Sequence, residues 1–249
     1  MAGKYIDPMW SIRRSVIPAA FAGWPSLCAV CHGWGLQRVC ADCVQRFGVR
    51  VPRCTQCALQ VPAGVALCGA CLTAPPPFVR SVAAVDYAYP WDSLITRFKF
   101  HAALDLVPAL ADRLAQAVAD DSATSPSLLL PVPLSTARLR ERGYNQAWEL
   151  TRRLGRLRQC PVDARLLLRV MDTPHQLALP PAQRAGNVRG AFAIEPGRRA
   201  ELQQLSVALI DDVMTTGATA AEITRVLLQA GVAQVQVWTV ARTPRPTSA

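Results

Sequence analysis

The chain has 249 residues, of which 51% are hydrophobic and 18% are charged, so it can bury a sizeable core and global disorder is excluded. No stretch approaches the roughly 18 continuous apolar residues of a membrane-spanning helix, so none is expected. The net charge is +10 although Lys4 and Lys99 are the only lysines, and eight of the nine cysteines fall between residues 28 and 71.

Residues 1–24 are expected to form an N-terminal leader. Arg13 and Arg14 precede a short apolar stretch over residues 16–24. This pattern can be interpreted as a secretion signal with a small-residue cleavage site at residues 20–22, but the apolar stretch is short and contains a proline. An amphipathic segment that packs on the body is favoured, and a cytoplasmic location is expected. In that compartment, paired cysteines more often bind metal than form disulfides.

The clustered cysteines form four Cys-x-x-Cys pairs. A two-residue spacer lets both thiolates of a tight turn point at one ion, and two such turns complete a tetrahedral shell. Four pairs therefore predict two structural zinc ions in a double zinc ribbon over residues 25–74. A segment this short cannot build its own core, so metal must supply the folding energy. The pairs are Cys28/Cys31, Cys40/Cys43, Cys54/Cys57 and Cys68/Cys71.

Three other uses of these cysteines fit the pattern less well. Disulfides need an oxidising compartment, iron–sulfur ligation shows a tighter run of cysteines, and a thioredoxin-like site has a single pair. Sequential pairing, first with second and third with fourth, closes the shortest loops and is favoured over a cross-braced arrangement. His32 is expected at the surface, and Cys160 is expected to be an inert, partly buried thiol.

Three prolines at residues 75–77 predict a stiff connector to a body over residues 78–249. Residues 81–89 alternate as a strand, and apolar residues then recur at helical steps from Asp92 to Leu114. Strands interleaved with helices predict an α/β fold, Rossmann-like, with a largely parallel sheet flanked by helices. Further strands are expected at residues 127–132, 166–170, 205–210 and 232–240, and further helices at 144–158 and 219–229.

The segment after residues 205–210 carries the sharpest chemical signal. An apolar strand stops at Asp211 and Asp212, the chain bends through a hydroxyl- and glycine-rich loop, and a helix begins. Free N–H groups at such a helix N-terminus favour a phosphate, whereas the two carboxylates suit the hydroxyls of a sugar. The alternative is an ordinary strand–turn–helix with solvated carboxylates. The loop residues are Thr215, Thr216, Gly217, Ala218 and Thr219.

This segment resembles the 5-phosphoribosyl-1-pyrophosphate (PRPP) motif of the type I phosphoribosyltransferases. The resemblance implies that Asp211 and Asp212 contact the ribose hydroxyls, that the loop holds the 5′-phosphate, and that magnesium enters with the pyrophosphate. Residues 131–134 stand where that family has its pyrophosphate loop, and residues 173–192 match its flexible lid. The lid residues singled out are Gln176, Arg184 and Asn187.

Together with the cysteine pairs, these motifs resemble the ComF family, competence-associated proteins with a double zinc ribbon and a phosphoribosyltransferase-like domain. Its Phe-Lys-aromatic, Arg-Gly-aromatic-Asn-Gln and Asp-Asp-x-x-Thr-Thr-Gly-x-Thr stretches correspond here to residues 98–100, 142–146 and 211–219. The resemblance implies a role in handling single-stranded DNA during natural transformation, with DNA-uptake proteins as partners, or in using DNA as a nutrient.

Residues 138–169 hold nine arginines against three acidic residues. Arg138, Arg140 and Arg142 are candidates to contact the pyrophosphate, which favours bidentate donors. Lys99, the only lysine of the body, is a candidate to face the ligand. The later arginines either track a nucleic-acid backbone along one helix face or form a solvated surface; they are Arg152, Arg153, Arg156 and Arg158.

Three functions stay open from the sequence. The first is a PRPP-binding ComF-type protein whose zinc ribbon docks partners or DNA. The second is an active, magnesium-dependent phosphoribosyltransferase that releases pyrophosphate; because only nine residues follow Val240, its acceptor pocket would come from the zinc ribbon or residues 78–101. The third is a non-catalytic adaptor with a PRPP-sensing pocket.

Overall fold

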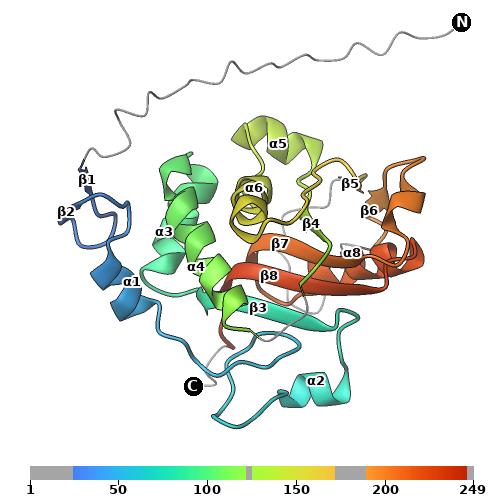
Figure 1. The fold of residues 1–249 in the computed structure, drawn as a ribbon, viewed down its shortest axis with the longest axis horizontal. Helices are drawn as coiled ribbons and strands as arrows, with labels where there is room; N and C mark the ends of the chain where they lie inside the picture. The colour runs from blue at the N-terminus through green and yellow to red at the C-terminus, as the bar shows by residue number, and fades with distance from the viewer. Residues whose placement is uncertain (1–24, 122–124, 172–188, 246–249) are drawn as a thin grey trace, which may run out of the picture.

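A four-stranded sheet forms the centre of the computed structural model, which describes residues 25–121, 125–171 and 189–245 (Figure 1). Its strand order is β3-β8-β7-β4, and every neighbouring pair is parallel. This arrangement confirms the predicted α/β fold with a largely parallel sheet. The strands are β3 (Arg80–Asp86), β4 (Leu128–Pro131), β7 (Ser206–Met214) and β8 (Gln234–Arg242).

Helices cover both faces of this sheet. On one face α4 contacts β3 and β8, and α6 contacts β4 and β7, whereas α8 contacts β8 from the other face. Within β7, Ala208 and Ile210 pack in the core beneath α4 and α6, whereas Val207 and Leu209 pack in the core beneath α8. Because successive strand side chains point to opposite faces, a strand covered on both sides is apolar throughout. The helices are α3 (Trp91–Phe100), α4 (Val107–Ala119), α5 (Thr136–Arg142), α6 (Gln146–Arg158) and α8 (Ala218–Gln229).

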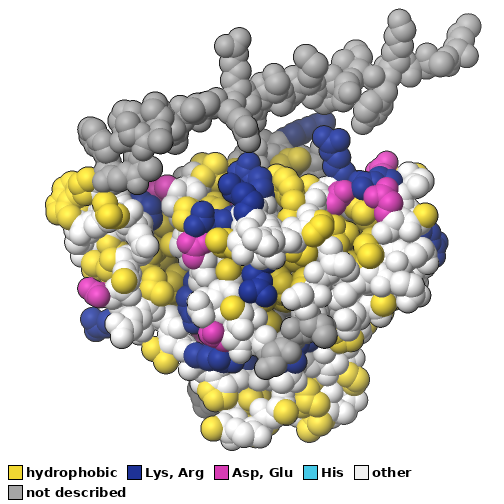
Figure 2. All heavy atoms as spheres, in the orientation of Figure 1, with side chains coloured by type: hydrophobic (Ala, Val, Ile, Leu, Met, Phe, Trp, Pro, Cys, Tyr) yellow, Lys and Arg dark blue, Asp and Glu magenta, His cyan; other side chains and the backbone are white. Residues whose placement is uncertain are grey.

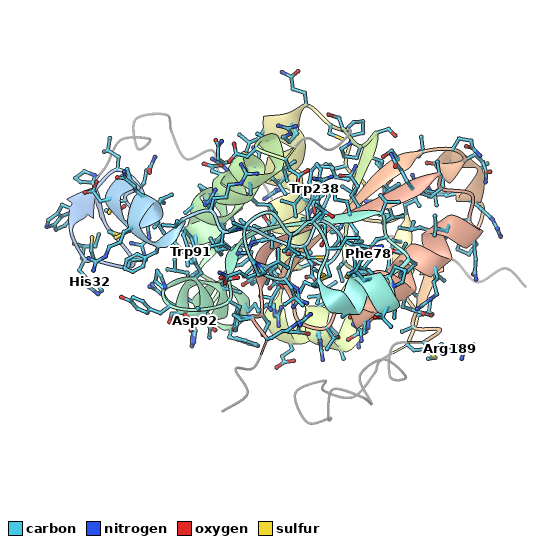
Figure 3. All side chains as sticks on the ribbon, turned by 90° about the horizontal axis from the view of Figure 1, so that it is seen from below. His32, Phe78, Trp91, Asp92, Arg189 and Trp238 are labelled. Carbon is cyan, nitrogen blue, oxygen red and sulfur yellow. The ribbon has the colours of Figure 1, made fainter. Side chains whose placement is uncertain are left out.

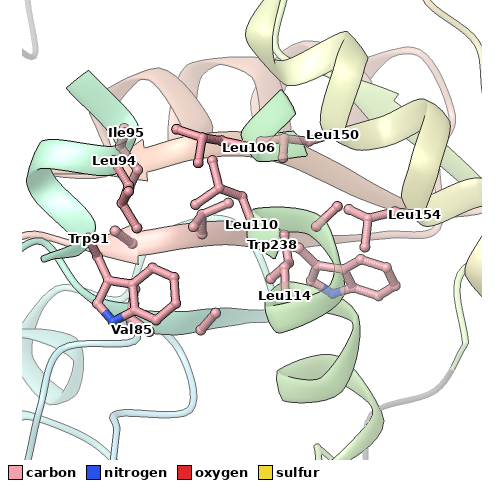
Figure 4. Close-up of a cluster of buried hydrophobic side chains, with 14 of the residues drawn as sticks. Val85, Trp91, Leu94, Ile95, Leu106, Leu110, Leu114, Leu150, Leu154 and Trp238 are labelled. Carbon is pink, nitrogen blue, oxygen red and sulfur yellow. The ribbon is translucent and has the colours of Figure 1, made fainter. Parts of the chain in front are cut away.

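The core beneath α3, α4 and α6 is built around two buried tryptophans (Figure 4). Trp91 begins α3 and Trp238 lies on β8, and leucines such as Leu110 and Leu150 fill the space between helices and sheet. Burying each such side chain contributes about 1.5–3 kcal/mol. This core fixes the helices whose ends surround the site described below.

The cysteine pairs lie in two separate parts of the molecule (Figures 1 and 3). The first part contains β1 (Ser26–Leu27), β2 (Trp34–Gly35) and α1 (Ala41–Phe47), and it packs beside α3 and α4. The second contains α2 (Gly69–Thr73) and lies next to β3. A further antiparallel pair, β5 (Leu167–Arg169) and β6 (Phe192–Ile194), flanks the main sheet.

Three elements differ from the sequence predictions. The helical pattern from Asp92 is interrupted after α3, where Ala102 has φ +49° and a 3₁₀ turn (Leu104–Leu106) precedes α4. The helix expected at residues 144–158 has a second helix, α5, in front of it. Strand β7 does not stop at Asp211 but runs to Met214, because its pairing with β8 continues past the carboxylates.

Two sequence predictions concern residues outside those described. The leader, residues 1–24, and most of the lid, residues 172–188, including Arg184, are among them. Among the described residues, no helix is both long and apolar enough to cross a membrane.

Candidate functional site

A cavity of about 480 Å³ lies at the carboxyl end of the sheet. Its walls come from the ends of β4 and β7, the loop between β7 and α8, helix α5 and the end of α3. Carboxyl ends of parallel strands meet at one edge of a sheet, which is where α/β folds bind ligands. The structure therefore brings the Asp-Asp segment, the threonine loop and the residues after β4 to one place.

The carboxylate pair on β7 lines the cavity, with Asp212 buried and Asp211 partly buried. Asp212 is 2% exposed, and its Oδ2 lies 2.9 Å from the Nζ atom of Lys99 on α3. Burial and then the charge of Asp212 raise the pKa of Asp211 well above its ordinary range, and Lys99 opposes that shift. Burial lowers the pKa of Lys99, but the two carboxylates outweigh it and the net shift is upward. Lys99 is therefore a cation at neutral pH and holds Asp212 in place.

The loop after β7 presents hydroxyls and the start of a helix to the same cavity. Gly217 caps the N-terminus of α8 in a left-handed conformation, φ +81°. The hydroxyl oxygen of Thr216 accepts a hydrogen bond from the Ala218 N–H at 3.3 Å. Thr215 and Thr219 also line the cavity, so all five loop residues singled out from the sequence are brought together. The positive end of the α8 dipole makes this loop suitable for an anion.

The Arg-Gly-aromatic-Asn-Gln stretch shapes the opposite wall. Gly143 ends α5 with φ +81°, and Asn145 caps α6 by accepting a hydrogen bond from the Ala147 N–H at 2.9 Å. The Asn145 amide also donates to the carbonyl of Val132 at 3.1 Å, and the Tyr144 hydroxyl donates to a carbonyl of α3. These bonds join the end of β4 to α3 and α6, so this stretch positions α5 against the cavity.

The basic residues singled out from the sequence are placed differently. Arg138 and Arg142 line the cavity, and the Arg142 guanidinium lies 5.2 Å from the centroid of the Phe100 ring. Arg140 is exposed and does not line it. The structure therefore places two of these arginines on the wall of the cavity that Lys99 also lines, and leaves the third exposed.

Several lining residues were not found from the sequence. Arg169 from β5 reaches the cavity, as does Thr239 from β8. The Thr239 hydroxyl is fully buried beside Asp211 in the strand register and has no hydrogen-bond partner in the described parts of the chain. No local pattern marks these positions, because strand pairing and helix ends far apart in sequence decide them.

Each half of the cysteine-rich segment gathers four thiols. Within each group the four sulfur atoms lie within 4.8 Å of one another, and the closest approaches are 3.6–3.9 Å. These distances are too long for disulfides, and all nine cysteines are free thiols. The grouping confirms the predicted sequential pairing: Cys28, Cys31, Cys40 and Cys43 in one group, and Cys54, Cys57, Cys68 and Cys71 in the other.

In each group, one thiol has a pKa below its ordinary value. Burial raises the pKa of Cys28, but hydrogen bonds from the backbone N–H groups of Cys31 and Cys40 outweigh it and lower the value to about 6. Burial likewise raises the pKa of Cys68, and the Cys71 backbone N–H with neighbouring thiols lowers it to about 7. Because thiolates are the ligands of soft metals, both groups can hold a metal ion.

The predictions for His32 and Cys160, which lie outside the two four-thiol groups, agree with the structure. His32 is exposed next to Cys31 and is not part of the four-thiol group. Cys160 is partly buried, its thiol donates to the carbonyl of Pro126, and burial raises its pKa. A raised pKa keeps the thiol protonated and unreactive.

A parallel sheet with a carboxylate pair and a hydroxyl-rich loop at its carboxyl edge, joined to two four-cysteine groups, defines a phosphoribosyltransferase-like protein with metal-binding modules. The DNA utilization protein YhgH of Salmonella typhimurium is 36% identical over 229 residues, 88% of this chain and 98% of that protein. Competence protein F of Haemophilus influenzae is 35% identical over 208 residues, 82% of this chain and 90% of that protein. The chain therefore belongs to the ComF family.

No protein-family model matches the chain. Among solved structures, the glutamine PRPP amidotransferase of B. subtilis is similar over 57% of this chain and 30% of its own, with 18% identity and a TM-score of 0.38. A hypoxanthine phosphoribosyltransferase of Staphylococcus aureus is similar over 59% and 68%, with 16% identity and a TM-score of 0.34. Both overlaps are partial, and the fold assignment depends on the topology described above.

Proposed function

We propose that the cavity binds PRPP together with magnesium and that the protein uses this site while handling DNA. The observation that carries the proposal is the meeting of the Asp211-Asp212 pair with the Thr215–Thr219 loop in one cavity. The names of the relatives, DNA utilization protein and Competence protein F, support the link to DNA.

The lining residues suggest how PRPP would be held. Loop N–H groups and threonine hydroxyls would bind the 5′-phosphate, and Asp211 and Asp212 would accept hydrogen bonds from the ribose hydroxyls. Arg138 and Arg142 would meet the pyrophosphate. When bound, magnesium would neutralise charge on the pyrophosphate oxygens.

Calorimetry tests the PRPP site directly. PRPP with Mg²⁺ should bind to the full chain, and Asp212→Ala should remove that binding because it deletes a ribose contact and leaves Lys99 without its partner. Ribose 5-phosphate should bind more weakly, since it lacks the pyrophosphate. An Asp212→Ala chain that binds PRPP as well as the original would contradict the site assignment.

We also propose that zinc occupies both four-cysteine groups. A tetrahedral zinc ion with Zn–S bonds of about 2.3 Å separates its sulfur ligands by about 3.8 Å. The closest sulfur pairs of the groups lie 3.6–3.9 Å apart, which fits this geometry. Free thiols in both groups also favour a reducing compartment, so we propose a cytoplasmic location.

An exposed face of α6 is the proposed contact with single-stranded DNA. Basic side chains gather over α5 and α6 on the face seen in Figure 2. Arg152, Arg156 and Arg158 are exposed on α6. Arg153 differs from them in its partner, because its guanidinium pairs with both carboxylate oxygens of Asp112 on α4 at 2.6 and 2.7 Å. Arg152 pairs with Glu149 of its own helix, and its side chain stays 53% exposed. Arg153 is therefore held between two helices, whereas the three exposed arginines are the candidates for phosphate contacts.

Replacing Arg152, Arg156 and Arg158 together with alanine is expected to weaken single-stranded DNA binding and flatten its salt dependence. Each phosphate contact contributes about 0.7 to the slope of log affinity against log salt, so losing three should reduce the slope by about 2. Fluorescence anisotropy of a labelled oligonucleotide at several salt concentrations measures this. Arg153→Ala is the matched control and should leave the slope unchanged; an equal loss in both variants would contradict the proposed face.

Gly217→Ala is expected to weaken phosphate binding about tenfold. Alanine at φ +81° costs roughly 1–2 kcal/mol of backbone strain, which the loop relieves by leaving its phosphate-binding shape. The new methyl itself has room, since its closest neighbour would be the Met214 sulfur at 3.6 Å. Gly197→Ala carries similar strain at φ +87°, with nothing within 4 Å, outside the cavity. Thermal unfolding should show a similar loss of stability in both, and ribose 5-phosphate calorimetry should separate them.

A further inference from the structure

The buried arginine at the end of β8 joins two parts of the molecule. Arg242 is 5% exposed, and its Nε donates to the carbonyl of Cys57 in the second four-cysteine group at 2.9 Å. Its Nη1 donates to the carbonyls of Met214 at 3.0 Å, of Thr215, and of Thr243 at 2.9 Å. Arg242 does not line the cavity, so it contacts the phosphate-loop backbone from behind.

The two loop carbonyls bound by Arg242 belong to successive peptide units. In a trans peptide the C=O and N–H point in opposite directions. Fixing the Met214 and Thr215 carbonyls on the guanidinium therefore turns the N–H groups of Thr215 and Thr216 away from Arg242. Those are the donors that open the phosphate-binding loop. Arg242 therefore sets the direction in which they point, together with the Thr243 N–H, which also donates to the Met214 carbonyl at 3.0 Å.

Apolar side chains also connect the second four-cysteine group to the phosphate-binding loop. Ala58, next to Cys57, shares a buried cluster with Phe78 and Met214. Phe78 is fully buried, lies near α2 in Figure 3, and would be 3.9 Å from a methyl group placed on Gly217. The second cysteine group therefore touches the loop through both packing and hydrogen bonds.

Metal in the second group would strengthen the hold of Arg242. Four thiolates around Zn²⁺ carry a net charge of −2, which stabilises a neighbouring buried guanidinium. A metal-free group lacks this fixed charge of −2 and lets the turn that presents the Cys57 carbonyl open.

We infer that Arg242 is a positioning residue that couples metal binding at the second four-cysteine group to phosphate binding at the loop. The inference depends on the proposed phosphate site. Coupling is reciprocal, so bound phosphate must strengthen metal retention by the factor with which metal strengthens phosphate binding. The first four-cysteine group provides an internal control for this coupling. It packs beside α3 and α4, in the core that contains Trp91, and not beside the phosphate-binding loop.

The test follows each cysteine separately in the zinc-loaded full chain. A chelator is added, thiols are labelled by timed pulses of N-ethylmaleimide, and mass spectrometry reports the labelling rate of each group. Saturating ribose 5-phosphate should slow labelling of the second group about fivefold or more, within the usual range of coupling. Labelling of the first group should change less than about twofold. Equal protection of both groups, or of neither while calorimetry shows binding, would overturn the inference.

Two variants separate coupling from simple structural support. Arg242→Lys keeps the charge but cannot bind the carbonyls of both sites at once; it should retain two zinc ions and lose the selective protection. Ser81→Ala removes another contact of the second group, the 2.8 Å hydrogen bond to the Gln56 carbonyl, and should keep that protection. Selective protection that survives in Arg242→Lys overturns the inference, and if this variant does not fold, the comparison of the two groups decides. Absence of any ribose 5-phosphate binding would instead contradict the phosphate site, and the coupling with it.

Discussion

Asp211→Asn is expected to stabilise the ligand-free protein while reducing its PRPP affinity about 100-fold. Two hydrogen bonds from ribose hydroxyls to Asp211, at about 1.5 kcal/mol each, account for the lost affinity. The gain in stability has a different origin. Burial and the adjacent Asp212 raise the pKa of Asp211 well above 3.8, so the folded protein resists the ionisation that the unfolded chain undergoes freely. Asparagine removes that penalty.

The sign of the pH dependence follows from the raised pKa. The folded protein binds the Asp211 proton more tightly than the unfolded chain does, so Asp211 lowers stability as pH rises above about 4. The advantage of Asp211→Asn should therefore be small near pH 4 and large at pH 8. Thermal unfolding measures it, with about 2–4 °C expected for each kcal/mol.

Asp163→Asn is the matched control with the opposite sign. Asp163 lies outside the cavity, pairs with Arg198 at 2.7 Å, and accepts hydrogen bonds from backbone N–H groups. Burial opposes these partners, but they lower its pKa, so its contribution to stability is present above about pH 4 and is lost as pH falls. This variant should lose stability at pH 8 and bind PRPP normally. An Asp211→Asn chain with unchanged affinity would contradict the carboxylate assignment.

Sequence patterns predicted those features that depend on local chemistry. Apolar residues on both faces of β7 required cover on both sides, and the parallel sheet follows from that. The Cys-x-x-Cys spacing predicted both four-thiol groups, because the two thiols of each turn need no distant residue to be placed. Lys99 was singled out by its rarity, and the structure places it 2.9 Å from Asp212.

Features that depend on distant contacts could not be predicted from these patterns. Helix α5 is seven residues long with no buried residue, so it lacks an apolar period. Arg153 has the same local pattern as its neighbours, and only the approach of α4 makes it an ion-pair partner of Asp112. Arg242 ends a strand in the sequence; its role depends on a carbonyl 185 residues earlier, at Cys57.

The separation of the two cysteine groups also changes how metal contributes to the fold. A compact double ribbon would form its own unit, whereas each group here packs into a different part of the body. Cys28, Val39 and Cys43 share the core that contains Trp91, and the Trp91 indole donates to the Phe47 carbonyl of α1 at 2.8 Å. Metal bound at the first group would therefore hold a wall of the main core in place.

Removing both metals is expected to lower the unfolding midpoint by more than about 10 °C. Structural zinc supplies about 10–16 kcal/mol in isolated zinc-finger peptides, and even a fraction of that exceeds the few kcal/mol this shift needs. Loss of the first group should expose Trp91, which is 2% exposed, and shift tryptophan emission to longer wavelength. Trp34 is already 75% exposed and should contribute little to the shift.

The measurement combines metal analysis, tryptophan emission and thermal unfolding before and after chelation. Purified chain should carry two zinc ions, and Cys160→Ser should carry the same number because its thiol lies outside both groups. Cys31→Ser should lose one zinc ion and show the emission shift, whereas Cys57→Ser should lose one zinc ion without it. That difference follows from where each group packs. A metal-free chain with the original unfolding midpoint would show that the thiol groups do not support the fold through metal.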